Sequence, residues 1–109
     1  MRLTGTRIRV GDFDVRAVVT DRRLARIGLI VPRYKHSAVD RNRLKRRLRE
    51  LVRLRVLPLW RERLQGVRAA DVVVRALPAA YRMTMAELAT RMDLVATAVR
   101  KRLAAEAGE

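Results

Sequence analysis

The densest chemical signal in the sequence is a run of cationic side chains at residues 41–55, RNRLKRRLRELVRLR. The run holds eight Lys and Arg residues and one acid, Glu50. A guanidinium group can grip two phosphate oxygens, so such a run is suited to binding a polyanion. A solvated helix face is the plain alternative, but stable faces of that kind usually pair acids with bases at i,i+4. The run therefore favours a nucleic-acid surface.

Side chains that could carry out catalysis are sparse. The chain has no cysteine and one histidine, His36, so it offers neither a thiolate site nor a histidine pair. A protein nuclease would need a general base, an acid and clustered metal carboxylates. Asp12, Asp14 and Asp21 are scattered, and we expect them to occupy turns or to balance nearby arginines. We therefore predict no catalytic residue and no metal site in this chain.

The composition is that of one small, strongly basic domain, which we assign to residues 1–109. Half of the residues are hydrophobic, which is enough for a core, and 26 Lys and Arg face 11 Asp and Glu, a formal charge of +15. Residues 1–63 carry +13 of that charge. Stretches free of charged residues reach only six residues, too short to span a membrane. No secretion signal opens the chain, so we expect it in the cytoplasm, bound to a nucleic acid and not to a membrane.

Periodicity predicts the order strand, strand, helix, strand, helix, which is an α+β two-layer sandwich of helices on a small sheet. Residues 7–20 suit one long or bulged strand interrupted at Gly11, residues 21–23 a turn, and residues 25–32 a second strand. A helix follows Ser37 and ends or kinks at Pro58, with another turn or two over residues 59–64. A break at residues 65–66 and a strand at 70–77 come next. The last helix opens at Thr84 with a capping box.

A helical wheel divides the basic helix into two sides. Its apolar face contains Leu44, Leu48, Leu51 and Val52. Steps of about 100° place the exposed stripe on the opposite side, with Lys45 on one flank. This stripe consists of Asn42, Arg43, Arg46, Arg49 and Arg53. Arg41 falls on the apolar side, so we expect its side chain to reach the sheet edge or an acid. The apolar face is needed for the core, which disfavours a membrane-surface helix.

The segment Ala38-Val39-Asp40-Arg41-Asn42-Arg43-Leu44-Lys45-Arg46, followed by Arg49-Glu50, resembles the signature of the bacterial ribonuclease P protein component. Residues 26–31 and 71–74 resemble the strands on either side of it. The resemblance covers about residues 5–103. It implies a small mixed sheet with a left-handed strand–helix–strand crossover, against the usual right-handed preference.

The resemblance also implies a function. In this family a catalytic RNA uses Mg²⁺ to remove the 5′ leader of precursor tRNA, and the protein binds both RNAs. No DNA partner is implied. The contacts to the catalytic RNA would be Arg41, Asn42, Arg43, Lys45 and Arg46, extended by Arg49 and Arg53 on the stripe and by Arg33 and Lys35 in the preceding loop. Phe13, Arg16, Tyr34 and Arg75 would contact the leader.

The sequence departs from the family pattern at several places. It reaches its first strand without the family's N-terminal helix, so either that helix is lost or the natural start lies upstream of Met1. Arg16 stands where an aromatic residue is common, and His36 where a glycine is common. The usual Ser-Lys-Lys/Arg before the signature is replaced by residues 32–34, and the usual arginine after the last strand by Leu77, for which Arg75 can substitute.

The aromatic residues have alternative interpretations. Phe13 suits either base stacking or the core. Tyr34, in a basic loop, favours stacking, whereas Trp60 is typical of a core residue. Two other functions compete with the family's: a protein-only nuclease, and a non-enzymatic RNA-binding protein of ribosomal type.

Overall fold

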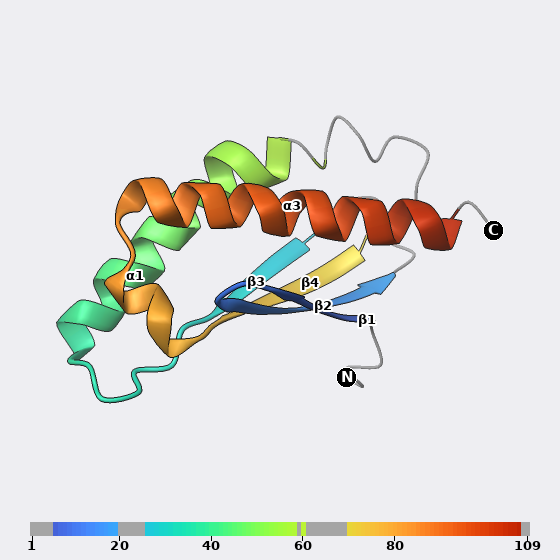
Figure 1. Ribbon diagram of the computed structural model, residues 1–109. Helices are drawn as coiled ribbons and strands as arrows, with labels where there is room; N and C mark the ends of the chain where they lie inside the picture. Colours follow the sequence, from blue (N-terminus) through green and yellow to red (C-terminus); the bar gives the residue numbers. More distant parts are fainter. Residues whose placement is uncertain (1–5, 20–25, 59, 61–69, 108–109) are drawn as a thin grey trace.

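The structure, a computed structural model, describes residues 6–19, 26–58, 60 and 70–107. One sheet contains β1 (Thr6–Val10), β2 (Phe13–Val19), β3 (Arg26–Ile30) and β4 (Ala70–Ala76). The helices are α1 (Ala38–Leu51), its π-helical continuation η1 (Val52–Val56), the 3-10 helix η2 (Pro78–Arg82) and α3 (Met85–Ala107). Both long helices lie on the same side of the sheet (Figure 1). This is the predicted α+β two-layer sandwich.

The sheet is mixed, with the strand order β1-β2-β4-β3. The pairs β1/β2 and β2/β4 are antiparallel, and β3/β4 is parallel. Parallel neighbours cannot be joined by a tight turn, and the basic helix α1 lies in the connection between them. The left-handed sense of this crossover stays a prediction of the resemblance.

Residues 7–20 do not form one bulged strand; this prediction was wrong. They form the hairpin β1/β2, in which Val10 pairs with Phe13 across a two-residue loop. Gly11, the first loop residue, has a φ of +53°, a conformation that glycine adopts without strain. A glycine in this position is the preference of type II′ hairpin turns. The glycine therefore reverses the chain instead of kinking a continuous strand.

Helix α1 begins as predicted. The Ser37 side chain caps it by accepting a hydrogen bond from the Asp40 backbone N–H at 3.1 Å. Pro58 does not end the helix: Leu57, Pro58 and Trp60 are all helical. Proline has no N–H to donate, and the π-helical turn η1 immediately precedes it. The predicted turn at 21–23 and the break at 65–66 lie outside the described residues.

The core lies between the sheet and the helices. One face of the sheet supplies buried side chains of β2 and β4 at alternate positions: Phe13, Val15, Ala17, Val72, Val74 and Ala76. On α3, the side chains of Leu88, Met92, Val95 and Val99 are buried, whereas Met85 is 40% exposed at the helix start. Trp60 is in the core as predicted, and its indole N–H donates to the Ala96 carbonyl at 3.1 Å.

The predicted capping box opens α3. The Thr84 backbone N–H donates to the Glu87 carboxylate at 3.0 Å, and the Glu87 N–H donates to the Thr84 hydroxyl at 3.2 Å. The hydrogen bond from the Thr84 backbone N–H to the charged carboxylate lowers the pKa of Glu87. No helix in the described ranges combines the length and apolar character needed to cross a bilayer.

Candidate nucleic-acid interface

The exposed side of α1 carries most of the predicted RNA-binding stripe. Leu44, Leu48 and Leu51 are buried against the sheet and α3, so the helix orientation follows the predicted wheel. The polar residues Asn42, Arg43, Arg46 and Arg49 are exposed. None of these three arginines forms an ion pair with an acid in the described part of the chain. Their charges therefore remain available to an anionic partner along one side of the helix.

Arg53, the last member of the predicted stripe, is exposed but paired. Its guanidinium donates two hydrogen bonds to Glu50, three residues earlier. This contact lowers the pKa of Glu50 and raises the pKa of Arg53. Glu50, the single acid in residues 41–55, therefore neutralises Arg53 at the end of the stripe next to η1. The open positive charge therefore lies between Arg43 and Arg49.

Arg41 is held in place. Its Nε donates to the Val31 carbonyl at 2.8 Å, just beyond the end of β3, and its side chain is half-buried. This matches the prediction that a charge on the apolar side must reach the sheet edge. The bond also ties the first turn of α1 to the strand that precedes it. Arg41 therefore positions the helix as well as adding charge.

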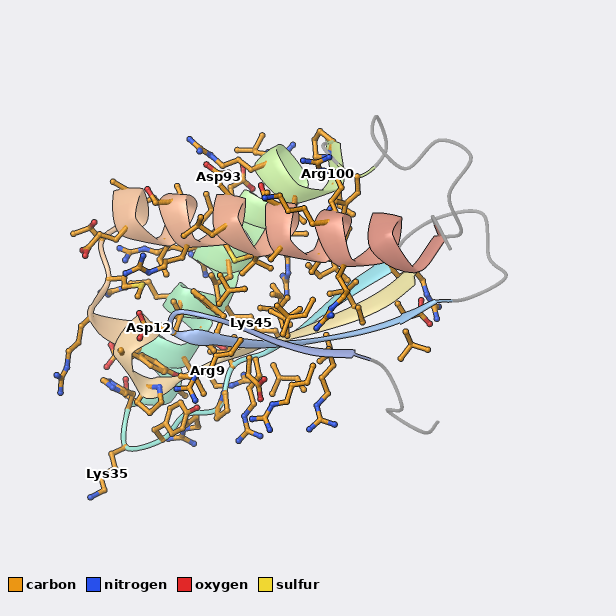
Figure 2. The ribbon with its side chains drawn as sticks, turned by 45° about the vertical axis from the view of Figure 1, so that its right-hand side comes forward. Arg9, Asp12, Lys35, Lys45, Asp93 and Arg100 are labelled. Atoms are coloured by element: carbon orange, nitrogen blue, oxygen red, sulfur yellow. The ribbon has the colours of Figure 1, made fainter. Side chains whose placement is uncertain are left out.

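The loop before α1 adds cations and an aromatic side chain. Arg33 and Lys35 are exposed, and Figure 2 shows Lys35 projecting away from the body of the protein. Tyr34 is 40% exposed and has a φ of +52°, which is uncommon for a residue with a side chain. Its hydroxyl donates to the Ala76 carbonyl at 2.8 Å. The Tyr34 ring is thereby fixed next to the end of β4, with part of its surface open.

Lys45 and Arg49 line a hollow on the β3 side of α1. The hollow has a volume of about 150 Å³, and Ile27, Leu29 and Val52 complete its walls. The Lys45 side chain is half-buried there, while that of Arg49 is exposed. A strand edge thus runs beside this flank of the basic helix. The positively charged surface of α1 therefore extends toward β3 on this side.

The second basic surface is the face of the sheet turned away from the helices. The register places Arg7 opposite Arg16, and Arg9 and Arg75 on either side of Asp14. Figure 2 shows nitrogen-tipped side chains projecting from this face, below the strands in that view. Two acids on it are paired: Asp14 with Arg7 at 3.0 Å and Asp71 with Arg26 at 3.1 Å. Arg7 lowers the pKa of Asp14 by its hydrogen bond.

Two predicted leader contacts, Arg16 and Arg75, lie on this open sheet face, and Arg9 joins them. None of the three forms an ion pair with an acid in ranges 6–19, 26–58 and 70–107. Phe13 does not lie there, and its prediction as a leader contact is corrected. Its ring is fully buried on the opposite face, because side chains alternate along β2 and Phe13 is three residues from Arg16. Of the two interpretations of Phe13, the core residue holds.

Asp12 and Asp14 occupy a turn or balance an arginine, as predicted. Asp14 pairs with Arg7, and Asp12 lies in the hairpin turn with its carboxylate 3.8 Å from Arg91. Asp21 falls outside the described residues. Within the described chain, no three His, Asp or Glu side chains gather closely enough to hold a metal ion. Asp12 and Asp14 thus neutralise arginine side chains within the protein.

Some features of the surface were not found by sequence reasoning. Arg9 alternates with Arg7 on β1, but assigning it to the open face requires the hairpin register. Arg47 is not among the predicted contacts, yet its side chain is exposed. Tyr81 gave no useful signal; its ring stacks on His36 with centroids 3.9 Å apart, and its hydroxyl donates to the Pro32 carbonyl at 2.6 Å.

Comparison with known proteins decides between the families that such a basic α+β domain could represent. The family model described as Ribonuclease P matches residues 3–100 of this chain. The chain belongs to the ribonuclease P protein family. Its signature helix is α1, and the strands on either side of the signature are β3 and β4. The resemblance of the sequence to this family is thus confirmed.

Two relatives in this family are named "Ribonuclease P protein component". That of Acidothermus cellulolyticus is 46% identical over 76 residues, which cover 68% of this chain and 56% of the relative. That of Kocuria rhizophila is 46% identical over 78 residues, 71% of this chain and 63% of the relative. The matched part is thus less than two thirds of either relative's length.

Solved structures of ribonuclease P proteins share the fold. The Staphylococcus aureus protein at 2.0 Å has a TM-score of 0.67 at 23% identity, and the match covers 87% of this chain and 81% of that one. The Thermotoga maritima protein has a TM-score of 0.60 at 26% identity, with 84% and 79% covered. The predicted fold class is confirmed by this likeness and by the mixed sheet described above.

Proposed function

We propose that this chain is the protein subunit of ribonuclease P, the enzyme that removes the 5′ leader of precursor tRNA. The observation that carries the proposal is the open positive charge on the exposed side of α1 in a member of this family. Arg43, Arg46 and Arg49 are exposed there without acidic partners in the described chain. A helix with these charges can follow a phosphate backbone.

The catalytic RNA binds to α1 and the preceding loop in this proposal. Asn42, Arg43, Arg46 and Arg49 contact it along the helix, and Lys45 does so from the β3 flank. Arg33 and Lys35 extend the surface into the loop. Arg41 acts mainly by holding α1 against Val31, and Arg53 contributes less because Glu50 already neutralises it. The result is a binding surface whose open charge lies on α1 and the loop before it, and not on η1.

The single-stranded leader lies over the open face of the sheet. Arg16 and Arg75 bind its phosphates, with Arg9 beside them. Tyr34 adds an aromatic surface at the end of β4, where it can stack on a base without reading its sequence. Phe13 takes no part because it is buried. Contact with the leader on this face is mostly electrostatic.

Hydrolysis takes place in the RNA subunit, and Mg²⁺ bound by that RNA supplies the metal chemistry. The described residues offer no carboxylate cluster for a metal, and the acids on the open sheet face, Asp14 and Asp71, pair with arginines. The role of the chain is to bind both RNAs and to lower the Mg²⁺ concentration that their productive association requires, since its cations neutralise phosphates. We place this activity in the cytoplasm.

Reconstitution tests the proposal. The chain is mixed with the catalytic RNA of its own source and a 5′-labelled precursor tRNA at low Mg²⁺, beside RNA alone and protein alone. We expect faster 5′ cleavage only when protein and RNA are combined. Cleavage by the protein alone would indicate a protein-only nuclease. Binding to many RNAs without any stimulation would indicate an RNA-binding protein of the ribosomal type, and either result overturns the proposal.

A further inference from the structure

A second hollow lies on the other flank of α1, where the helix meets the loop before it and η2. It has a volume of about 190 Å³. Its floor and walls include the apolar side chains of Leu44, Ala80 and Met83. A dry cavity of about 150 Å³ is large enough to bind benzene, so this hollow has room for one aromatic ring. It is smaller than the usual pockets for drug-sized ligands.

Two unpaired guanidinium groups stand at this hollow. Arg43 and Arg47 line it from successive turns of α1, and both side chains are exposed. Neither forms an ion pair with an acid in the part of the chain that the structure describes. Arg43 also belongs to the stripe proposed to bind RNA, so the hollow is continuous with that surface. An occupant of the hollow is therefore expected to carry negative charge beside its ring.

The remaining walls are polar and aromatic. His36 and Tyr81 both line the hollow, and their rings are stacked with an interplanar angle of 2°. The Tyr81 hydroxyl is fixed on the Pro32 carbonyl, which holds the stack in place. The Asp40 carboxylate also lines the hollow; its Oδ2 lies 3.7 Å from His36 Nδ1, beyond hydrogen-bond distance. Asp40 is thus an available acceptor beside an aromatic wall.

We propose that this hollow binds one unpaired nucleotide of an RNA, with the base inside and its phosphate on Arg43 and Arg47. The inference rests on the proposed function, because it adds a base pocket to the α1 surface. RNA-binding proteins commonly read unstacked bases through aromatic or guanidinium surfaces and hydrogen bonds to base edges. Asp40, as an acceptor, favours bases with an amino group. The pocket therefore prefers adenine, cytosine or guanine over uracil.

The test uses short RNA hairpins that are identical except for one bulged nucleotide: A, C, G, U or an abasic residue. Binding to the full-length chain is measured by fluorescence anisotropy at one salt concentration. We expect the A, C and G bulges to bind about tenfold more tightly than the abasic bulge, with U between them. Equal affinity for all five hairpins would overturn the pocket and leave the proposed function standing. A chain that binds none of them would overturn both.

Two variants separate the pocket from the general charge of the helix. Asp40→Ala should abolish the preference for amino-bearing bases over U, because it removes the acceptor. Arg49→Ala, on the opposite flank of α1, should weaken binding to all five hairpins by the same factor. If Asp40→Ala keeps the preference, or if Arg49→Ala removes it, the pocket is wrongly assigned.

Discussion

The charge on α1 gives a quantitative prediction for the double variant Arg43→Ala, Arg46→Ala. Both side chains are exposed, and neither forms an ion pair with an acid among the residues that the structure describes. Each can therefore neutralise one phosphate. Each neutralised phosphate contributes about −0.7 to −0.9 to the log–log slope of affinity against salt. Losing two should make the slope shallower by about 1.4 to 1.8. The ratio of the affinity of the unmodified chain to that of the double variant should therefore fall about tenfold when salt rises from 50 to 200 mM.

The assay is titration of the catalytic RNA at several salt concentrations, with circular dichroism to verify the fold. The matched control is Arg55→Ala with Arg102→Ala, which lowers the formal net charge of +15 by the same two units. Arg55 already pairs with Asp93 at 2.8 Å, and Arg102 lies on the last turns of α3. The control should keep its slope to within about half a unit. Equal slopes in the two double variants would show that net charge, and not the α1 surface, drives binding.

Three further predictions concern stability. Thr84→Ala should lower the unfolding free energy by about 1 kcal/mol in urea titration, because it removes the N-cap hydroxyl of α3. Unfolding free energy should fall as the pH drops below about 4.5, the ordinary pKa of glutamate, because the folded pKa of Glu87 is lowered. Trp60→Phe should cost about 1 kcal/mol or more through the lost bond to Ala96, measured by thermal unfolding.

Each of these predictions has a contradicting result. An unchanged stability in Thr84→Ala would mean that the capping box does not hold the start of α3. The sign of the pH effect is fixed, since a group with a lowered folded pKa stabilises above its unfolded pKa and loses that effect in acid. Stability that rises between pH 5 and 3 would contradict it, and Glu87→Gln, as control, should show a shallower decline. A Trp60→Phe variant as stable as the parent would show that the hydrogen bond from the indole to Ala96 does not contribute to the free energy of unfolding.

The helix and its basic side could be predicted because local rules decide them. The spacing of Leu44, Leu48 and Leu51 fixes which face is buried, and that face alone determines where Arg46 and Arg49 point. The hairpin was missed although Gly11-Asp12 is an acceptable two-residue turn, because alternation continues on both sides of it. Because one strand was predicted over residues 7–20 in place of the hairpin β1/β2, the sequence could not decide on which face of the sheet Phe13 lies.

The hollow beside α1 could not be predicted, because it joins parts of the chain that are far apart. His36 precedes α1, Arg47 lies in its third turn, and Tyr81 belongs to η2. No periodicity connects position 36 with position 81; the connection arises when the parallel pairing of β3 and β4 brings the ends of both strands together. Likewise, Arg9 became part of the open sheet face only through its register with Asp14.

The most direct test of the central claim, that RNA lies along the exposed side of α1, is a tethered-probe footprint in the reconstituted complex. The chain has no cysteine, so single-cysteine variants can each carry one iron-chelate cleavage reagent. Arg46→Cys places the reagent on the stripe, and Arg102→Cys places it on the far turns of α3, away from α1 (Figure 1). We predict localised cuts in the catalytic RNA from position 46 and none above background from position 102. Cuts from position 102 with none from position 46 would contradict the account.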